Sequence, residues 1–324
     1  MRSLNSLLLA LGTPLKGTPR PWKNFEVPAL MVNAYEIIKS KKLRQDIKKS
    51  GGLHNFLGFD GIIFLDSGGF QAMTHEVTIH LKSLGKIYKT AKADHYFSLD
   101  YPSLTARNSK KKIKLTIANY EELRKETEEV IPIVHPDLSR ALVEYEAYRK
   151  HDPNYIAIGG LVPLMLTSKG ISKGRKRAID LIAEIKKRYN RSLHVMGLGA
   201  PTVTPILKTL ACSSTDSAAW RIKAAHGKIM LPNSGERYVS RRGAKFNARA
   251  LSEEEKHSIE KLQCSVLDEY GWEGLQGSFQ IRALFNAWIT LHASHKQNKL
   301  NGPFGKLQRY AEERAKTIGV VALC

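Results

Sequence analysis

Short apolar runs recur along the chain, and stretches with helical periodicity separate many of them. The runs occupy residues 29–35, 62–68, 95–100, 130–135, 155–161 and 192–198, with weaker ones at 212–220 and 228–233. Apolar runs of this length, bounded by turn residues, are typical of buried strands. Strand and helix alternating about eight times predicts an α/β fold with parallel strands, and eight such units predict a closed (β/α)8 TIM barrel.

The intervening segments at 113–130, 137–150 and 174–189 are predicted helices, and Asp137 stands at a helix-capping position. From about residue 250 the pattern changes, because three helical segments at 252–270, 278–297 and 305–318 follow one another without a strand. We therefore predict a barrel catalytic domain over 1–250 and a C-terminal helical subdomain over 251–324, packed on the barrel.

The charge of the chain indicates its class of partner. The 324 residues include 51 Lys and Arg but only 30 Asp and Glu, which gives a formal net charge of +21. Basic surface neutralises phosphates and releases their counterions, so the simplest partner is a nucleic acid. A small neutral substrate has no use for such a field. A generally basic proteome or a need for solubility would also give a basic chain.

Cysteine usage fits a reducing cytoplasm, because Cys212, Cys264 and Cys324 lie far apart and no Cys-x-x-Cys pair is present. The apolar run at 7–11 has no clear cleavage site after it and is interpreted as an early segment at the base of the barrel. No apolar stretch approaches the roughly 20 residues that span a membrane, so no membrane partner is expected.

Acids and glycines stand where the expected strands end. These positions are Asp66, Asp100, His135, Gly159, Gly160, Gly197 and Asp216. The carboxyl ends of barrel strands meet at one mouth, where catalytic residues lie. One Asp after a strand is equally a helix cap or a turn residue, but three at one mouth favour a site. Paired carboxylates suit chemistry at a glycosidic carbon.

The glycines would let a flat ligand approach the backbone. Phe70 could stack on a base and Met196 could cover its other face. Without the surrounding motif, both side chains would be assigned to ordinary core packing.

Five strings in this chain resemble motifs of the tRNA-guanine transglycosylase superfamily, in the same order. They are LDSGGFQ (65–71), IAIGGL (156–161), HVMGLGAP (194–201), STDSAAW (214–220) and GERYVSRRGAKFNARAL (235–251). With the strand at 29–35 they extend over most of the expected barrel. The resemblance implies a TIM barrel and base exchange at a nucleoside, without a cofactor.

The resemblance also assigns roles by position. Asp216 would be the nucleophile at C1′, and Asp66 the acid/base. The two carboxyls are expected to face one pocket, roughly 5–6 Å apart by analogy with retaining glycosidases. Asp100 would bind the base's Watson–Crick edge. The substrate-binding residues would be Ser67, Gly68, Gly69, Phe70, Asp100, His135, Gly159, Gly160, Leu161, Met196 and Gly197.

Two departures from the family pattern matter. His135 stands where the family has Gln-Gly-Gly, which puts base selectivity in question. The region of the family's structural zinc site contains only Cys264, so zinc is predicted to be absent. The missing zinc cysteines, the compact length, STDSAAW and the heavy basic charge resemble the DNA-modifying branch, which inserts 7-deazaguanines in bacterial modification clusters and phages.

The sequence therefore favours exchange of guanine in DNA for a free 7-deazaguanine base such as preQ0. The alternative is a tRNA-guanine transglycosylase of queuosine or archaeosine type. A catalytically inactive nucleic-acid-binding subunit is less favoured, because both acids are present, and the charge argues against a free-nucleoside hydrolase. The expected location is the cytoplasm, of the host if the gene is a phage's. The oligomeric state stays open. Flanking phosphates would be held by Arg241, Arg242, Lys245 and Arg249.

Overall fold

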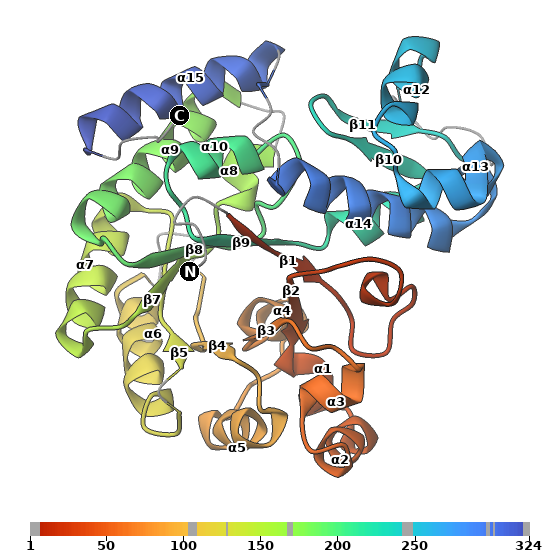
Figure 1. Cartoon of the computed structure of the whole chain (residues 1–324). Coiled ribbons are helices and arrows are strands. Elements are labelled where there is room, and N and C mark those ends of the chain that lie inside the picture. Colours follow the sequence, from red (N-terminus) through yellow and green to blue (C-terminus); the bar gives the residue numbers. More distant parts are fainter. Residues whose placement is uncertain are drawn as a thin grey trace. The chain divides into compact units, whose positions relative to one another are not determined.

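The computed structural model describes residues 7–102, 109–127, 129–166, 171–241, 249–295, 299–300 and 302–319. The chain divides into two compact units (Figure 1). The first unit comprises Met1–Leu11, Lys16–Val27 and Leu198–Cys324, and the second comprises Gly12–Leu15 and Pro28–Gly197.

Nine strands of the described residues form one sheet in the order β5-β4-β3-β2-β1-β9-β8-β7-β6. The two terminal members of this order, β5 (Val130–Ile131) and β6 (Ile133–Val134), are separated only by Pro132. They are the two halves of the single strand expected at 130–135. The order therefore begins and ends on the same stretch of chain, which confirms the predicted α/β fold of TIM-barrel type.

Pro132 explains why this strand is split. Proline has no backbone N–H and cannot complete a ladder on both sides. β5 pairs in parallel with β4, with Phe97 opposite Ile131, and β6 pairs in parallel with β7, with Ile133 opposite Ala157. The carbonyl of Pro132 still accepts a hydrogen bond from the Ala157 N–H at 2.9 Å.

The second unit contains β2 to β8 and the helices between them. Its other strands are β2 (Ala29–Asn33), β3 (Ile62–Asp66), β4 (His95–Phe97), β7 (Tyr155–Ile158) and β8 (Ser192–Val195). Its helices are α1 (Ala34–Lys39), α2 (Lys41–Lys49), α3 (Leu53–Leu57), α4 (Gly69–Thr74), α5 (Leu81–Ala91), α6 (Ser109–Leu123), α7 (Leu138–Tyr148), η2 (Arg149–His151), α8 (Val162–Leu166) and α9 (Ile171–Arg188).

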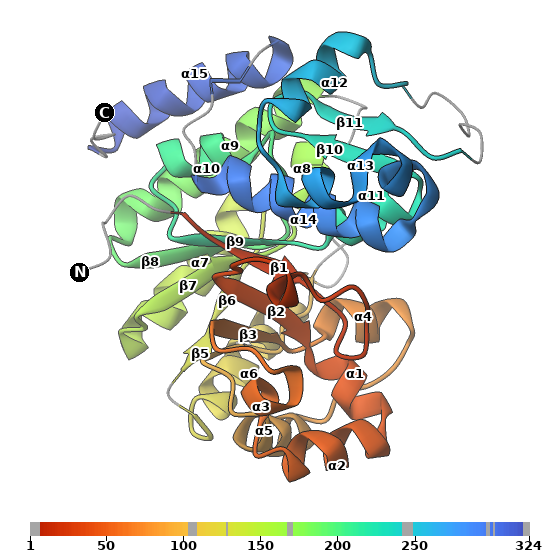
Figure 2. The same cartoon turned by 45° about the vertical axis from the view of Figure 1, so that its right-hand side comes forward.

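The first unit contains two barrel strands, a hairpin and the C-terminal helices. Its elements are β1 (Leu8–Gly12), η1 (Pro21–Lys23), α10 (Thr204–Thr209), β9 (Ser214–Ser217), α11 (Ala219–Ala225), β10 (Lys228–Leu231), β11 (Gly235–Tyr238), α12 (Glu253–Glu260), α13 (Ser265–Gly277), α14 (Phe279–His295) and α15 (Gly302–Thr317). Figure 2 shows the hairpin beside α13 and α14. None of the helices in the described ranges is long and apolar enough to cross a bilayer.

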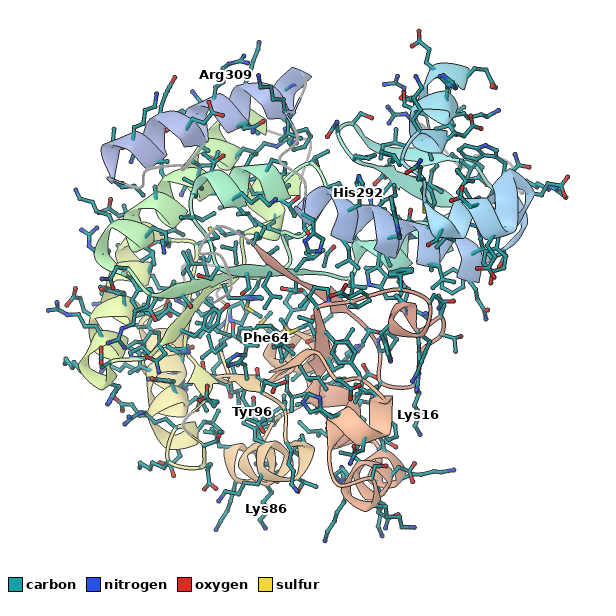
Figure 3. The ribbon with its side chains drawn as sticks, viewed as in Figure 1. Lys16, Phe64, Lys86, Tyr96, His292 and Arg309 are labelled. Atoms are coloured by element: carbon teal, nitrogen blue, oxygen red, sulfur yellow. The ribbon has the colours of Figure 1, made fainter. Side chains whose placement is uncertain are left out.

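Aromatic rings fill the interior of the second unit. Phe64 of β3 packs on Phe97 of β4, with ring centroids 6.0 Å apart, and on His194 of β8 at 5.4 Å. Figure 3 shows Phe64 inside this packed region, whereas Lys86 points outward from α5. Parallel strands buried on both faces need such near-continuous apolar runs, which is why the pattern of the sequence revealed them.

One expected strand is wrong. The run at 228–233 was a candidate eighth barrel strand, but β10 pairs antiparallel with β11 in a separate two-stranded sheet. The barrel strand that replaces it is β1, which pairs in parallel with β9. The segment at 7–11 is therefore a strand of the barrel itself. A short apolar run does not reveal its partner, because pairing is decided by tertiary contacts.

The domain boundary expected at 250/251 stays a prediction. Within the first unit, β10 shares a buried core with the helices that follow residue 251. That core consists of Ile229, Met230, Leu231, Ile259, Cys264, Val266, Leu267, Leu275, Leu284, Phe285 and Ile289.

Candidate active site

Asp66 ends β3, and its carboxylate is held by the neighbouring strand. In the parallel register Asn33 of β2 stands opposite Asp66. The Asn33 Nδ2 donates to Asp66 Oδ2 at 2.8 Å, while Asn33 Oδ1 accepts from the Tyr35 N–H at 2.8 Å and so caps α1. The Gly68 N–H donates to the same Asp66 oxygen at 3.2 Å. Asp66 is thus a half-buried, oriented carboxylate.

Gly68 and Gly69 are required by the protein's own packing. Gly68 has φ +83°, and a Cβ placed on it would lie 2.6 Å from Tyr35 Cβ. A Cβ on Gly69 would lie 2.6 Å from the backbone oxygen of Asp100 and 3.0 Å from its Oδ1. The space that the sequence suggested for a ligand is therefore taken, at the Cβ positions, by Tyr35 of α1 and by Asp100, which follows β4. Contact of these glycines with a base stays a prediction.

The two neighbours of these glycines differ in exposure. Ser67 is fully buried, whereas Phe70 on the first turn of α4 leaves 56% of its surface exposed. An exposed phenylalanine beside an oriented carboxylate has a flat apolar face open to a ligand.

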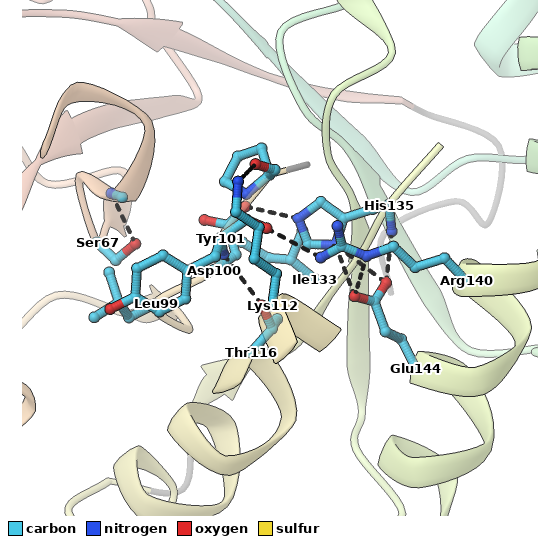
Figure 4. A network of polar contacts seen from close by, with 12 residues as sticks. Ser67, Leu99, Asp100, Tyr101, Lys112, Thr116, Ile133, His135, Arg140 and Glu144 are labelled. Carbon is cyan, nitrogen blue, oxygen red and sulfur yellow. Dashed lines mark hydrogen bonds and ion pairs between the residues drawn. The ribbon is translucent and has the colours of Figure 1, made fainter. Parts of the chain in front are cut away.

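Asp100 follows β4 and is fixed through both of its chain neighbours. Asn119 Nδ2 of α6 donates to the Leu99 carbonyl at 2.9 Å, and Thr116 Oγ1 accepts from the Tyr101 N–H at 3.1 Å. The side chain of Asp100 is 12% exposed. The backbone around this carboxylate is therefore held by α6 (Figure 4).

His135, which follows β6, is buried between two carboxylates. Its Nε2 lies 2.9 Å from Asp100 Oδ2, and its Nδ1 lies 3.0 Å from Glu144 Oε1 of α7. Arg140, one turn before Glu144, donates from Nε to Glu144 Oε1 at 2.7 Å and from Nη2 to the Tyr101 carbonyl at 3.1 Å. Figure 4 shows this network running from Asp100 to α7.

The electrostatics follow from that geometry. Burial alone lowers the pKa of His135, but the hydrogen bonds and charges of Asp100 and Glu144 outweigh it, so the pKa of His135 is raised above its usual value. The protonated ring is therefore favoured in the folded protein. The N-cap predicted at Asp137 is confirmed, because Asp137 Oδ1 accepts from the Arg140 N–H at 3.0 Å and starts α7 beside this network.

Glycines also end the next two strands of the second unit. Gly159 follows β7, and a Cβ on it would lie 3.6 Å from the sulfur of Met196. Gly160 and Gly197 have φ +71° and +73°. Gly160 is exposed, Leu161 is fully buried and Met196 is half-buried. Met196 thus lies beside Gly159. Its expected contact with a base, and those of Gly160 and Leu161, stay predictions.

Asp216 belongs to the first unit, where it stands in β9 opposite Ala10 of β1. Its carbonyl accepts from the Gly199 N–H at 2.9 Å, and a Cβ on Gly199 would lie 2.9 Å from that oxygen. Gly199, which belongs to the same unit, therefore packs closely against the backbone of β9. The side chain of Asp216 is half-buried. Its separation from Asp66, which lies in the second unit, stays a prediction.

Two of the four expected phosphate-binding cations are described. Arg241 and Arg249 are 62% and 72% exposed at the side chain, with long ion-pair contacts at 3.9 Å to Glu273 and 3.6 Å to Glu255. Arg241 Nε also donates to Gln276 Oε1 at 3.5 Å. Arg242 and Lys245 lie outside the described residues.

The region of the family's zinc site does not fit zinc. Cys264 is fully buried in the apolar core of the first unit, and burial raises the pKa of its thiol to about 11. Zinc binds the thiolate, which this environment disfavours. Within the ranges that the structure describes, no group of three His, Cys, Asp or Glu could hold a metal.

Three residues that hold other groups of the site in place were missed by sequence reasoning: Asn33, Arg140 and Glu144. The first stands at the end of an expected strand, like Asp66, and was passed over because it is not an acid. The other two are spaced by four residues on a predicted helix, a spacing that puts them on one face, but only the structure shows which strand end that face covers.

The fold is an α/β barrel with oriented carboxylates after its parallel strands. This arrangement is typical of barrel enzymes, whose catalytic residues lie at that end of the strands. The model of the family described as queuine tRNA-ribosyltransferase matches residues 10–300, and the chain belongs to that family. The superfamily resemblance is thereby confirmed.

Several relatives are named after tRNA. The tRNA-guanine(15) transglycosylase of Nanoarchaeum equitans is 30% identical over 210 residues, which cover 63% of this chain and 50% of the relative. That of Pyrococcus furiosus is 26% identical over 316 residues, 92% of this chain and 49% of the relative. Protein 306 of Sulfolobus islandicus rod-shaped virus 1, described as uncharacterised, is 28% identical over 228 residues, 70% of this chain and 69% of the relative. The chain spans about half the length of the tRNA-guanine(15) transglycosylases that it matches.

Proposed function

We propose that this protein exchanges guanine in a polynucleotide for a free 7-deazaguanine base, through a covalent intermediate on Asp216. The observation that carries the proposal is the family match over residues 10–300, together with an oriented carboxylate, Asp66, in the family's most distinctive string.

The chemistry requires two displacements. The Asp216 carboxylate attacks C1′ of the target nucleoside, the C1′–N9 bond breaks, and the leaving guanine takes a proton from the protonated Asp66. The incoming base then gives its N9 proton to the Asp66 carboxylate, its nitrogen attacks C1′, and the bond to Asp216 breaks. Two inversions give net retention, and the enzyme is regenerated without a cofactor.

Transfer RNA is the favoured polymer, because the relatives that match this chain are named tRNA-guanine(15) transglycosylases. This reverses the preference for DNA drawn from the sequence. DNA is kept as the second candidate on one observation: the zinc-site region holds a single cysteine, Cys264, packed in an apolar core. The loss of that site suggests a different way of holding the polymer. The insertion of preQ0 in particular remains part of the proposal.

The test is an exchange assay with tritium-labelled guanine and either unmodified tRNA or duplex DNA. Label entering tRNA supports the favoured polymer, and label entering DNA alone supports the second candidate. Label entering neither polymer would overturn the proposed function. Asp216→Asn is expected to abolish exchange and any trapped covalent adduct, whereas Asp66→Asn is expected to slow exchange by about 10²–10⁴-fold.

A further inference from the structure

Asp100 begins a series of side chains connected by hydrogen bonds, which continues through His135 to Glu144 and Arg140 of α7. Asp100 is its partly exposed end, at 12%, whereas His135 and Glu144 are 2% and 0% exposed. Asp100 is the residue expected to form hydrogen bonds with the Watson–Crick edge of the base, whereas His135 is too deeply buried to contact the base directly. The role of His135 therefore has to be sought in what it does to Asp100.

His135 donates to Asp100 in two hydrogen-bonding arrangements, one with a cationic and one with a neutral ring. If the ring is cationic, Nε2 donates to Asp100 and Nδ1 to Glu144. If it is neutral, Arg140 Nη2, 3.0 Å from Nδ1, can donate to Nδ1, and the proton stays on Nε2. In both cases Asp100 Oδ2 accepts from Nε2 at 2.9 Å.

The hydrogen bond from His135 takes up part of the acceptor capacity of Asp100 Oδ2, and Asp100 can still accept further hydrogen bonds. The other oxygen, Oδ1, packs against Gly69, where a Cβ would lie 3.0 Å from it. Arg140 holds the adjacent Tyr101 carbonyl at 3.1 Å, so α7 holds both the side chain and the backbone at this point. The carboxylate cannot rotate without breaking a buried, charge-assisted hydrogen bond.

We propose that His135 is a positioning residue that keeps Asp100 an oriented acceptor and thereby restricts the base to one with two donors on its Watson–Crick edge. The inference rests on the proposed base exchange. Guanine offers its ring N1–H and its exocyclic amine, hypoxanthine only the N1–H, and adenine has an acceptor at N1. The order of acceptance is therefore guanine, then hypoxanthine, then adenine.

The deciding variants are His135→Gln and His135→Asn. Glutamine places its amide near the position of Nε2 and can still donate to Asp100, whereas asparagine ends near Nδ1 and falls short. His135→Asn is expected to raise KM for guanine about 10- to 100-fold with little change in kcat, and to reduce the preference for guanine over hypoxanthine. His135→Gln is expected to stay within about threefold of the parent. His226→Gln, an exposed histidine of the first unit, is the matched control.

A purely structural role would make both variants lose activity in step with their melting temperatures. The proposal is overturned if KM and base preference are the same in His135→Asn and the parent, or if the two variants are equally impaired. It is supported only if the glutamine restores what the asparagine loses.

A readout without exchange separates this inference from the proposed function. One histidine ring signal in the NMR spectrum should titrate at a higher pH than the signals of the exposed histidines, and it should be missing in His135→Gln. Asp100→Asn should lower the midpoint of that titration. A signal that titrates with the exposed histidines would overturn the positioning role. If no polymer is labelled, retention of tritiated guanine in equilibrium dialysis decides. Retention by the parent and His135→Gln but not by His135→Asn supports the role, and no retention by the parent overturns it.

Discussion

At the scale of single residues, the candidate site depends on side chains that hold other side chains. Asn33 caps α1 and binds Asp66 with opposite ends of one amide. His135 similarly joins Asp100 to Glu144. Each acid is thus oriented by a partner that is itself held by a second hydrogen bond, and such supporting contacts keep a functional side chain in one geometry.

Gly68 gives the first residue-scale prediction. Gly68→Ala is expected to lower the free energy of unfolding by about 2–4 kcal/mol, because the left-handed backbone and the contact with Tyr35 both oppose a Cβ. Gly277→Ala in α13 is the control. No atom lies within 4 Å of the Cβ it would add, so a change of less than about 1 kcal/mol is expected. Urea unfolding of both variants tests this, and equal midpoints would contradict it.

His135 gives a prediction on pH. Because its pKa is raised on folding, the protonated ring contributes stability that is fully present below its usual pKa, near 6.5. That contribution is lost as pH rises through the raised value. The stability difference between the parent and His135→Gln should therefore be largest below about pH 6.5 and shrink at higher pH. Urea midpoints of both proteins measured across this range test it, and a difference that grows with pH would contradict the assignment.

The acids that follow strands could be identified from the sequence. The side chains that form hydrogen bonds to those acids could not. Asp66, Asp100 and Asp216 stand out because an acid after an apolar run is visible in the sequence. Arg140 and Glu144 do not, because their role depends on which strand end the face of α7 covers. Gly68 has a positive φ, a conformation that favours glycine. A side chain is excluded there because Gly68 also packs closely against Tyr35.

At the scale of elements, the prediction was accurate where one run of residues decides the outcome. The cap at Asp137 and the helices at 137–150 and 174–189 correspond to the N-cap of α7, to α7 and to α9. The helix expected at 252–270 is instead two, α12 and α13, separated where Gln263 takes φ +53° and Cys264 enters the core. The run at 228–233, which contains β10 of the hairpin, was mistaken for a barrel strand, because β10 is a short apolar segment like the barrel strands.

Asn286 is the element-scale test, because its side chain joins α14 to β10 and to the first turn of α11. The fully buried amide accepts from the Met230 N–H at 2.7 Å and donates to the Trp220 and Lys228 carbonyls at 3.0 Å. Asn286→Ala is expected to cost about 2–4 kcal/mol, because it leaves these backbone groups unpaired. Thermal unfolding measures it. Asn24→Ala, at an exposed amide, should change stability by less than about 0.5 kcal/mol, and a similar loss in both would contradict the role of Asn286.

At the scale of the whole molecule, the formal charge of +21 predicts how the proposed polynucleotide substrate would bind. The affinity for a polynucleotide should fall steeply with salt, since each phosphate contact releases counterions. Arg241→Glu with Arg249→Glu is expected to lower the slope of log K against log salt, measured by fluorescence anisotropy. Arg149→Glu with Lys150→Glu changes the net charge equally in another part of the chain and should preserve the slope. Equal slopes for both double variants would contradict a role for Arg241 and Arg249.

The exposed ring of Phe70 has a thermodynamic consequence. Water around an apolar surface raises the heat capacity of the unliganded protein, and a base that covers the ring would release that water. Binding of the base should then carry a negative heat-capacity change, visible as a reaction enthalpy that becomes more favourable on warming. Phe70→Ser should reduce this temperature dependence. Calorimetry at several temperatures would in this way show whether the ring that the fold leaves in solvent is the surface on which the base rests.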